Sequence, residues 1–382
     1  MFVRRRNSAI LSDTKRTIGF IVNPIAGMGG KVGLKGTDGA DALQRALRLG
    51  AKPIAPMRAK VFLSELTPVK DHVSLIVGTA SMGEDEAKEY GFSFEVVGGR
   101  RKQTTPNDTK EIARRIKEEN AELLVFCGGD GTARDILDAI GTSVPVLGVP
   151  TGVKMHSAIF AVSPIAAAIT TTQFLFDGLP LREMEVMDVN EEAFRDGRLS
   201  VSLYGYMLTP YEHQFIQGSK IATATTESEL RNQAAIAIYV IETMEEETLY
   251  IVGPGTTTRT IADLLDEKKT LLGVDLFLNK KIIARDVNEG KILKEIKGRK
   301  AKIIVTPIGG QGFIFGRGNQ QISPKVIKEV GLNNITIIAT KTKLSGLNNL
   351  RVDTGDLKLD KELRGQRTII TDYKEEHTIK ID

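Results

Sequence analysis

The chain is poor in several features that would place it in a specialised class of protein. It has one cysteine in 382 residues, which excludes an intramolecular disulfide framework and fits a reducing cytoplasm. Its 52 basic and 48 acidic side chains leave a formal charge of +4, which does not support a nucleic-acid surface. No apolar run approaches the roughly 18 residues of a membrane span, and the N-terminal segment lacks the apolar stretch of a secretory signal. We therefore expect a cytoplasmic protein with no nucleic-acid partner and no membrane partner.

What the chain does contain is typical of a globular protein with two domains. Hydrophobic residues make up 41% and charged residues 26% of the chain, and 382 residues exceed what one core usually needs. Over residues 16–181, apolar runs alternate with segments of helical spacing, which predicts an α/β domain built on a doubly wound parallel sheet. We expect its strands at 17–22, 73–77, 92–97, 123–127 and 144–149, and helices at 40–49 and 105–119.

The second half of the chain is richer in strands. We predict a β-rich domain over residues 182–382, with one helix at 227–244. Its expected strands are 199–206, 248–252, 271–278, 302–307, 335–340 and 368–371.

The run 123–137 is the most informative stretch of the sequence. A chargeless strand leads into Gly128-Gly129-Asp130-Gly131-Thr132, and a helix is expected to follow over 133–140. A strand, a glycine turn and a helix N-terminus together form an anion site, because free backbone N–H groups and the positive helix end face the turn. Glycines also let a phosphate or a ribose approach the backbone closely. Asp130 is placed to take a proton from a substrate hydroxyl or to hold a metal.

Two further glycine loops follow strands. Residues 23–31 lack the spacing of a Walker loop, and Val32 stands where the dinucleotide fingerprint has its third glycine. An ordinary turn explains this loop equally well in isolation, but a neighbouring glycine loop favours phosphate binding. In the loop 148–157, Thr151, Lys154 and Ser157 are candidates to face the same cleft. For His156 and Cys127 we favour packed, structural roles.

The segment 309–321 holds five glycines and no acidic residue, which is more glycine than one turn requires. Arg317 could brace a phosphate by a bidentate contact, although a structural hairpin or a subunit contact is the alternative. Asp353 and Asp356 flank a Thr-Gly pair. Turn capping and metal or ribose binding are equally favoured for them.

These motifs resemble one known family. The Gly128–Thr132 turn, with Asn23-Pro24 at the end of the first strand, looks like the ATP-NAD kinase superfamily, which includes the diacylglycerol and sphingosine kinases. The resemblance extends over about 16–375 and is nearest to the prokaryotic ATP-NAD kinase/acetoin-catabolism-X branch. It rests further on the stretches 148–157, 253–259, 270–275, 308–321 and 351–356. It implies an NAD kinase-like fold, with a β-sandwich-like C-terminal domain, a site in the interdomain cleft, and a homo-oligomer.

The resemblance also implies roles for individual residues. Asp130 matches the family's turn aspartate, the proposed base for the accepting hydroxyl. The candidate nucleotide- and phosphate-binding residues are Asn23, Gly27, Gly29, Gly30, Lys31, Gly128, Gly129, Gly131, Thr132, Thr151, Gly152 and Lys154. The candidate acceptor-binding residues are Gly255, Thr256, Thr257, Thr258, Arg259, Asp275, Gly310, Gln311, Arg317 and Asn319. The threonine run lacks the tyrosine of the family's motif, and no obvious Asn-Glu pair stands at the end of a second-domain strand. The position of a metal is not assigned.

The favoured function is therefore phosphoryl transfer, which requires donors around the phosphate, Mg²⁺ and a group that positions the nucleophile. We expect a kinase that uses Mg²⁺ and ATP, or another phosphate donor such as polyphosphate, to phosphorylate the 2′-hydroxyl of NAD and form NADP. One alternative keeps this chemistry and changes the acceptor to a small polyol, a sugar or a lipid. The other alternative is a nucleotide-binding sensor without turnover.

Overall fold

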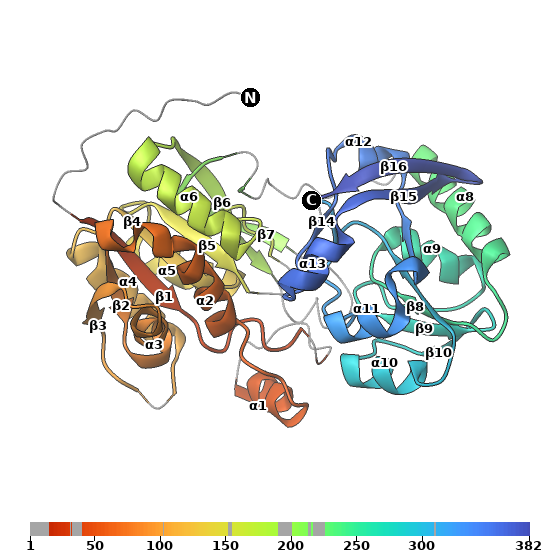
Figure 1. Cartoon of the computed structure of the whole chain (residues 1–382), viewed down its shortest axis with the longest axis horizontal. Helices are drawn as coiled ribbons and strands as arrows, with labels where there is room; N and C mark the ends of the chain where they lie inside the picture. The colour runs from red at the N-terminus through yellow and green to blue at the C-terminus, as the bar shows by residue number, and fades with distance from the viewer. Residues whose placement is uncertain are drawn as a thin grey trace.

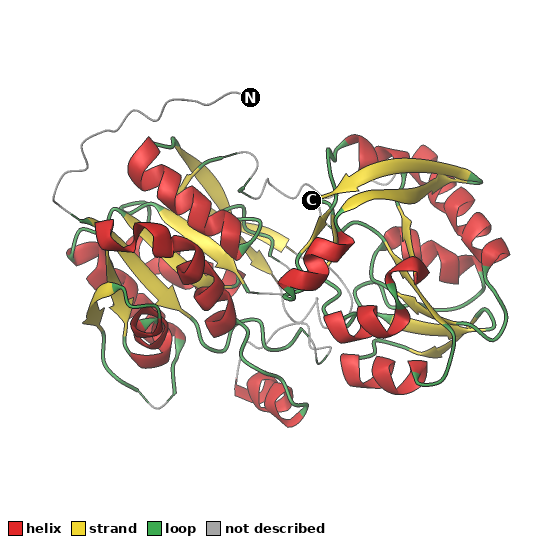
Figure 2. Ribbon diagram, viewed as in Figure 1, coloured by secondary structure: helices red, strands yellow, loops and turns green. Residues whose placement is uncertain are grey.

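The computed structural model describes residues 15–30, 32, 40–101, 103–151, 155–189, 201–212, 215–216, 226–308 and 311–382. Two domains lie side by side along the longest axis of the molecule (Figure 1). Figure 2 shows that each domain has strands at its centre and helices packed around them.

The N-terminal sheet is parallel throughout, and its strand order among the described residues is β3-β2-β1-β4-β5. Its strands are β1 (Arg16–Val22), β2 (Val73–Gly78), β3 (Ser93–Val97), β4 (Leu123–Gly128) and β5 (Val146–Pro150). Strand β4 lies between β1 and β5 and is buried over its whole length, as a chargeless run between two helical layers should be. The predicted doubly wound parallel sheet is confirmed.

Helices cover both faces of this sheet. Side chains of α2, α3 and α6 share one apolar core with the sheet, and those of α4 and α5 share the core on the opposite face. At the start of α4, a capping box is present, with the Thr105 backbone N–H donating to Asp108 Oδ2 over 2.7 Å. The helices of this domain are α1 (Ala40–Arg48), α2 (Ala55–Leu66), α3 (Glu84–Glu89), α4 (Pro106–Glu118), α5 (Asp130–Ile140) and α6 (Pro164–Asp177), with short 3₁₀ turns η1 (Thr67–His72) and η2 (Ala80–Met82).

A two-stranded antiparallel ribbon follows, formed by β6 (Leu181–Val189) and β7 (Val201–Pro210). Val186 and Met207 are fully buried in the same core as α4 and α5. The Ala158 N–H also donates to the Glu185 carbonyl over 2.8 Å. The ribbon therefore packs on the first domain, which continues past the expected boundary at 181/182, because its inward residues complete the first core.

The C-terminal sheet is mixed, with the order β10-β9-β8-β11-β13-β15-β16 among the described residues. Strands β8, β11, β13 and β15 run parallel, and the strands at both ends pair antiparallel. Their bounds are β8 (Leu249–Val252), β9 (Asp275–Leu278), β10 (Lys281–Ala284), β11 (Ala301–Val305), β13 (Ile335–Ile338), β15 (Gly365–Asp372) and β16 (Glu375–Ile381), and a separate parallel pair is β12 (Phe313–Phe315) with β14 (Arg351–Val352).

Helices cover this second sheet on both faces as well. Residues of α8 and α9 pack into one apolar core, and residues of α10, α11 and α13 pack into another. The helices are α8 (Glu227–Thr243), α9 (Thr256–Leu264), α10 (Glu289–Ile296), α11 (Pro324–Val330), α12 (Lys341–Ser345) and α13 (Leu357–Leu363), with the 3₁₀ turn η4 (Leu332–Asn334). The strand-rich second domain is confirmed; its main sheet lies between helices, whereas the family resemblance implied a β-sandwich-like packing. The reason is that strands 249–252, 301–305 and 335–338 pair in parallel, and parallel pairs need crossover connections that helices supply.

Within the described part of the chain, no helix is long and apolar enough to cross a membrane.

Candidate functional site

The chain order of the first sheet reverses direction between β1 and β4, which lie side by side. In doubly wound sheets, ligands bind beyond the carboxyl ends of the strands at such a switch point. Asn23 follows β1 and ties the two loops together. Its backbone N–H donates to the Cys127 carbonyl over 2.9 Å, and its Nδ2 donates to Thr132 Oγ1 over 2.9 Å. The structure thus places the first and second glycine loops next to each other, as predicted.

The glycines of the second loop have different surroundings. A Cβ on Gly128 would lie 2.6 Å from the Cβ and Oγ1 of Thr132, so a side chain there would displace Thr132. A Cβ on Gly129 would meet no atom within 4 Å. Gly129 is the N-cap residue of α5, and its own side of the turn is open to a ligand. Gly131 lies in the first turn of α5.

Asp130 is the first residue of α5, and its carboxylate is held by the loop that follows β5. The His156 N–H donates to Oδ2 and the Ser157 N–H donates to Oδ1, each over 2.8 Å. The Ser157 hydroxyl accepts in turn from the Met187 N–H over 2.9 Å, which anchors the loop to β6. These bonds fix the orientation of the carboxylate at the helix N-terminus.

The third loop also contacts the first. Gly27 has φ +77°, and a Cβ there would lie 2.0 Å from the Thr151 carbonyl oxygen, so only glycine allows this approach. Thr151 is 2% exposed, and its hydroxyl has no hydrogen-bond partner within the described residues. The Gly29 and Gly30 residues are buried in the first loop. Lys31, Gly152 and Lys154, which we also assigned to this site, lie outside the described residues.

The side chain of Cys127 is fully buried, and burial raises the pKa of its thiol well above the ordinary value. A raised thiol pKa disfavours the thiolate, so the structural interpretation of Cys127 stands.

The threonine segment of the second domain, residues 255–259, forms the start of helix α9. Gly255 is the N-cap residue of α9, and the Thr258 hydroxyl donates to the carbonyls of Gly253 and Gly255 over 2.8 and 3.0 Å. Thr257 is 2% exposed, whereas Thr256 and Arg259 are exposed. In Figure 1, α9 lies farther from the N-terminal domain than α11 and α13 do. The hydrogen bonds of the Thr258 hydroxyl stay within residues 253–258.

Asp275 is fully buried and makes structural contacts. Its carboxylate accepts hydrogen bonds from the Thr270 N–H and hydroxyl, over 2.7 and 2.6 Å, and from the Asp286 N–H over 2.7 Å. These bonds fix the loop before β9. Because Asp275 is fully buried, it has no accessible surface with which to contact an acceptor.

The glycine-rich segment proves to be largely a domain contact. Arg317 is 7% exposed, and its Nη2 donates to the Val162 carbonyl of the first domain over 2.9 Å. Asn319 is fully buried and bonds within its own segment, to the Ile314 carbonyl and from the Gly316 N–H. Gln311 lies in the same segment, and Gly310 lies outside the described residues. Of the interpretations left open for this segment, the structural one fits these contacts.

The sequence did not indicate the main polar contact between the domains. Arg58, on α2, places Nη1 2.5 Å from Asp353 Oδ1, and Arg317 Nε lies 3.4 Å from the other carboxylate oxygen. Although burial alone would favour the neutral carboxyl, the two guanidinium groups hold the pKa of Asp353 below its ordinary value. Burial lowers the pKa of Arg317 to about 10, and Asp353 opposes this. Asp353 is therefore an ion-pair partner.

Asp356 has the capping role that was one of the two open alternatives. It is the N-cap residue of α13, and its Oδ1 accepts from the N–H groups of Lys358 and Leu359 over 3.1 Å each. Within the described residues, no group of three or more His, Cys, Asp or Glu side chains is arranged to hold a metal ion.

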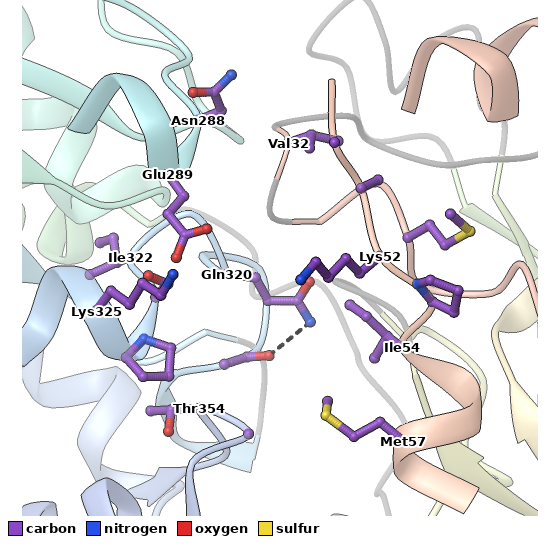
Figure 3. A pocket seen from close by; sticks show the side chains of 18 of the residues that line it. Val32, Lys52, Ile54, Met57, Asn288, Glu289, Gln320, Ile322, Lys325 and Thr354 are labelled. Atoms are coloured by element: carbon purple, nitrogen blue, oxygen red, sulfur yellow. Dashed lines mark hydrogen bonds between the residues drawn. The ribbon is translucent and has the colours of Figure 1, made fainter. Parts of the chain in front are cut away.

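A cavity of about 520 Å³ lies between the domains, beside this ion pair (Figure 3). Met28 and Val32 of the first loop and the start of α2 line one side, and residues of α10, α11 and the turn before α13 line the other. The volume is within the range of small-molecule sites in proteins, roughly 300–1,000 Å³. Neither Asp130 nor the Gly255–Arg259 segment lines it.

Comparison with known families agrees with this architecture. Residues 18–178 match the family model of the ATP-NAD kinase N-terminal domain, and residues 246–381 match that of the ATP-NAD kinase C-terminal domain. A search of curated proteins finds no match for the chain. The two matched segments cover most of the sequence and coincide with the two sheets, so the chain carries both domains of an NAD kinase-like kinase and belongs to the ATP-NAD kinase superfamily.

Proposed function

We propose that the protein transfers the γ-phosphate of ATP to a hydroxyl of a small molecule, that this acceptor is the 2′-hydroxyl of NAD, and that NADP is the product. The observation that carries the proposal is the position of Asp130, a carboxylate oriented by two backbone N–H groups at the N-terminus of α5 and at the switch point of the sheet.

In the proposed reaction, the acceptor oxygen forms a bond to the γ-phosphorus while the bond from that phosphorus to the β–γ bridging oxygen breaks. The proton of the acceptor hydroxyl passes to the Asp130 carboxylate, and ADP leaves. The open side of Gly129 and the N-terminus of α5 would stabilise the charge on the transferred phosphate.

Mg²⁺ fits this site as a partner of the nucleotide. One or two carboxylates, together with phosphates and water, usually suffice to hold Mg²⁺ in phosphate-transfer enzymes. Because both oxygens of Asp130 accept backbone N–H groups and Asp130 is the proposed base, the ion would be held mainly by the phosphates and water. When bound, the ion would neutralise charge on the phosphates.

The test is NADP formation from Mg-ATP and NAD, followed with an NADP-specific dehydrogenase. Asp130→Asn should lower the rate by about 10²-fold or more, since general-base catalysis contributes at least that much. Asp138→Asn is the matched control, because Asp138 lies on the same helix but is exposed and pairs with Lys110. An Asp130→Asn variant with a rate near that of Asp138→Asn would refute the role of Asp130.

A different hydroxyl acceptor is the second candidate. The observation that favours it is that Thr258, Asp275 and Asn319, all assigned to acceptor binding, use their polar groups within the C-terminal domain. ATP consumption with polyols or sugars, but not with NAD, would select this candidate.

A further inference from the structure

Two successive backbone N–H groups converge on the candidate base. Those of His156 and Ser157 donate to the two oxygens of the Asp130 carboxylate, each over 2.8 Å. Successive N–H groups of an extended strand point to opposite sides, so their convergence requires a bend in the chain. The structure has this bend at Ser157, followed by a turn at residues 158–159. Successive N–H groups in such a bend form a concave site for an anion. The orientation of the carboxylate therefore depends on what holds the bend in place.

The side chain of Ser157 anchors the bend to β6. It is fully buried, and its hydroxyl oxygen accepts a hydrogen bond from the Met187 N–H over 2.9 Å. The N–H of the next residue, Ala158, bonds to the same strand, at the Glu185 carbonyl, over 2.8 Å. In a regular strand pairing, backbone carbonyls accept the N–H groups of the neighbouring edge. Here a side-chain oxygen takes one of those places, and the main chain of Ser157 turns toward Asp130. The sequence made Ser157 a candidate to face the ligand cleft, whereas the structure directs its side chain to β6.

The ribbon that holds Ser157 is itself seated on α5, the helix that begins with Asp130. Val186 of β6 is fully buried in the core that α5 shares. A Cβ on Gly205 of β7 would lie 2.8 Å from Leu137 Cδ2, so the ribbon approaches the helix closely. The contacts form a closed ring, in which α5 holds the ribbon, the ribbon holds the Ser157 hydroxyl, and the Ser157 N–H holds the carboxylate. Removal of the hydroxyl opens this ring at one point.

We propose that Ser157 is a positioning residue for phosphoryl transfer, and that its hydroxyl fixes the Asp130 carboxylate to the ribbon β6–β7. This inference rests on the proposed function, in which the carboxylate takes the proton of the acceptor hydroxyl. A general base works only within hydrogen-bond reach of that proton, so a displaced carboxylate lowers turnover more than it lowers nucleotide affinity. Ser157 acts through Asp130, so its removal has no further effect once Asp130 has lost its function.

The first measurement is the rate of NADP formation by Ser157→Ala. Its kcat should fall by about tenfold, while the KM for ATP should change by less than about twofold. Ser163→Ala is the matched control, because the Ser163 hydroxyl also accepts a backbone N–H, that of Ala166 over 3.1 Å, but at the start of α6. This control should keep both constants, and circular dichroism melts verify that both variants are folded. A Ser157→Ala protein with the kcat of the control overturns the proposal.

A double-mutant cycle tests whether Ser157 acts through the carboxylate. In the Asp130→Asn background, Ser157→Ala should lower the remaining rate by less than about twofold, because the group that it positions is no longer a base. A second loss of about tenfold in that background would show that Ser157 acts independently of Asp130, which also overturns the proposal.

Amide hydrogen exchange, measured by nuclear magnetic resonance, gives a readout that requires no activity. The N–H groups of His156 and Ser157 donate to Asp130 and should exchange slowly in the wild type and in Ser163→Ala. In Ser157→Ala, the amides of these two positions should exchange about tenfold faster or more, while those of β4 are unchanged. Equal exchange in the two variants overturns the proposal. Faster exchange in a protein that forms no NADP would count against the proposed function and in favour of the Ser157 anchor, so the two failures are distinguishable.

Discussion

Gly128 and Gly129 are neighbours in the sequence, but the reason for a glycine differs between the two positions. Gly128 is required by packing, because a methyl group there would lie against the side chain of Thr132. Gly129 is not required by packing, because open space adjoins it and its φ of −115° suits any residue. Packing does not explain Gly129, and this glycine lies at a helix N-terminus. We therefore expect that a bound phosphate requires it.

This contrast gives a prediction for two alanine variants. Gly128→Ala should lower the free energy of unfolding by about 1–3 kcal/mol, through overpacking against Thr132. Gly129→Ala should leave it within about 0.5 kcal/mol but weaken ATP binding. Urea denaturation and ATP titration of both variants measure the two effects. A Gly129→Ala variant that binds ATP as the wild type does would show that the open space is not a phosphate position.

Glu86 gives a prediction for pH. It is 3% exposed on α3, and burial raises its pKa to about 7, well above the ordinary value of 4.5. Between those two values the folded state holds a proton that the unfolded state has released, so stability falls as pH rises through this range. Glu86→Gln should remove this loss. Its melting temperature should exceed that of the wild type at pH 8, by more than at pH 5. A difference that does not change with pH would contradict the buried position of the carboxyl.

At the scale of elements, local sequence patterns predicted those helices and strands whose positions depend on residues close together in the chain. Strands β1, β2, β4 and β8 and helices α4 and α8 were predicted to within a few residues, because apolar periodicity and capping residues are local signals. Helix α2 was missed. Pro53 and Pro56 suggest a loop, although Ala55, Ala59, Phe62, Leu63 and Leu66 have helical spacing and are buried.

We assigned the ribbon β6–β7 to the second domain. Its two strands pair with each other, but the core that they complete belongs to α4 and α5, which lie earlier in the chain. A fragment of residues 1–216 should therefore unfold cooperatively, whereas a fragment of residues 1–181 should not. The shorter fragment lacks Val186 and Met207, and so exposes the core that they fill. Thermal melts followed by circular dichroism compare the two. A cooperative melt of the 1–181 fragment at the same temperature would place the ribbon outside the first domain.

At the scale of the whole molecule, contacts between residues far apart in the sequence decide how the domains are joined. Arg58 and Asp353 are separated by 295 positions, and nothing in either local sequence indicates the other. The same limit applies to Asp275 and Asn319. Their residue types suggested ligand binding, but only the folded chain shows that their polar groups are used internally. The switch-point loops were predictable because each follows its own strand.

Arg58→Met should lower the free energy of unfolding by about 3–5 kcal/mol, because it removes the nearest partner of a buried carboxylate. Lys60→Met is the matched control on the same helix. It breaks an exposed pair with Glu89, which should cost at most about 1 kcal/mol. Denaturant titrations give both values. Equal stability of the two variants would show that the Arg58–Asp353 pair does not join the domains.

The central claim is that phosphoryl transfer takes place at the switch point with Asp130 as the base. The most direct measurement is transfer of label from γ-³²P-ATP to NAD, with ATP affinity determined on the same preparations. The account predicts labelled NADP from the wild type and from Asp138→Asn. For Asp130→Asn it predicts a turnover number lower by about 10²-fold or more, with ATP affinity retained. Equal labelling by the Asp130→Asn and Asp138→Asn proteins would contradict it.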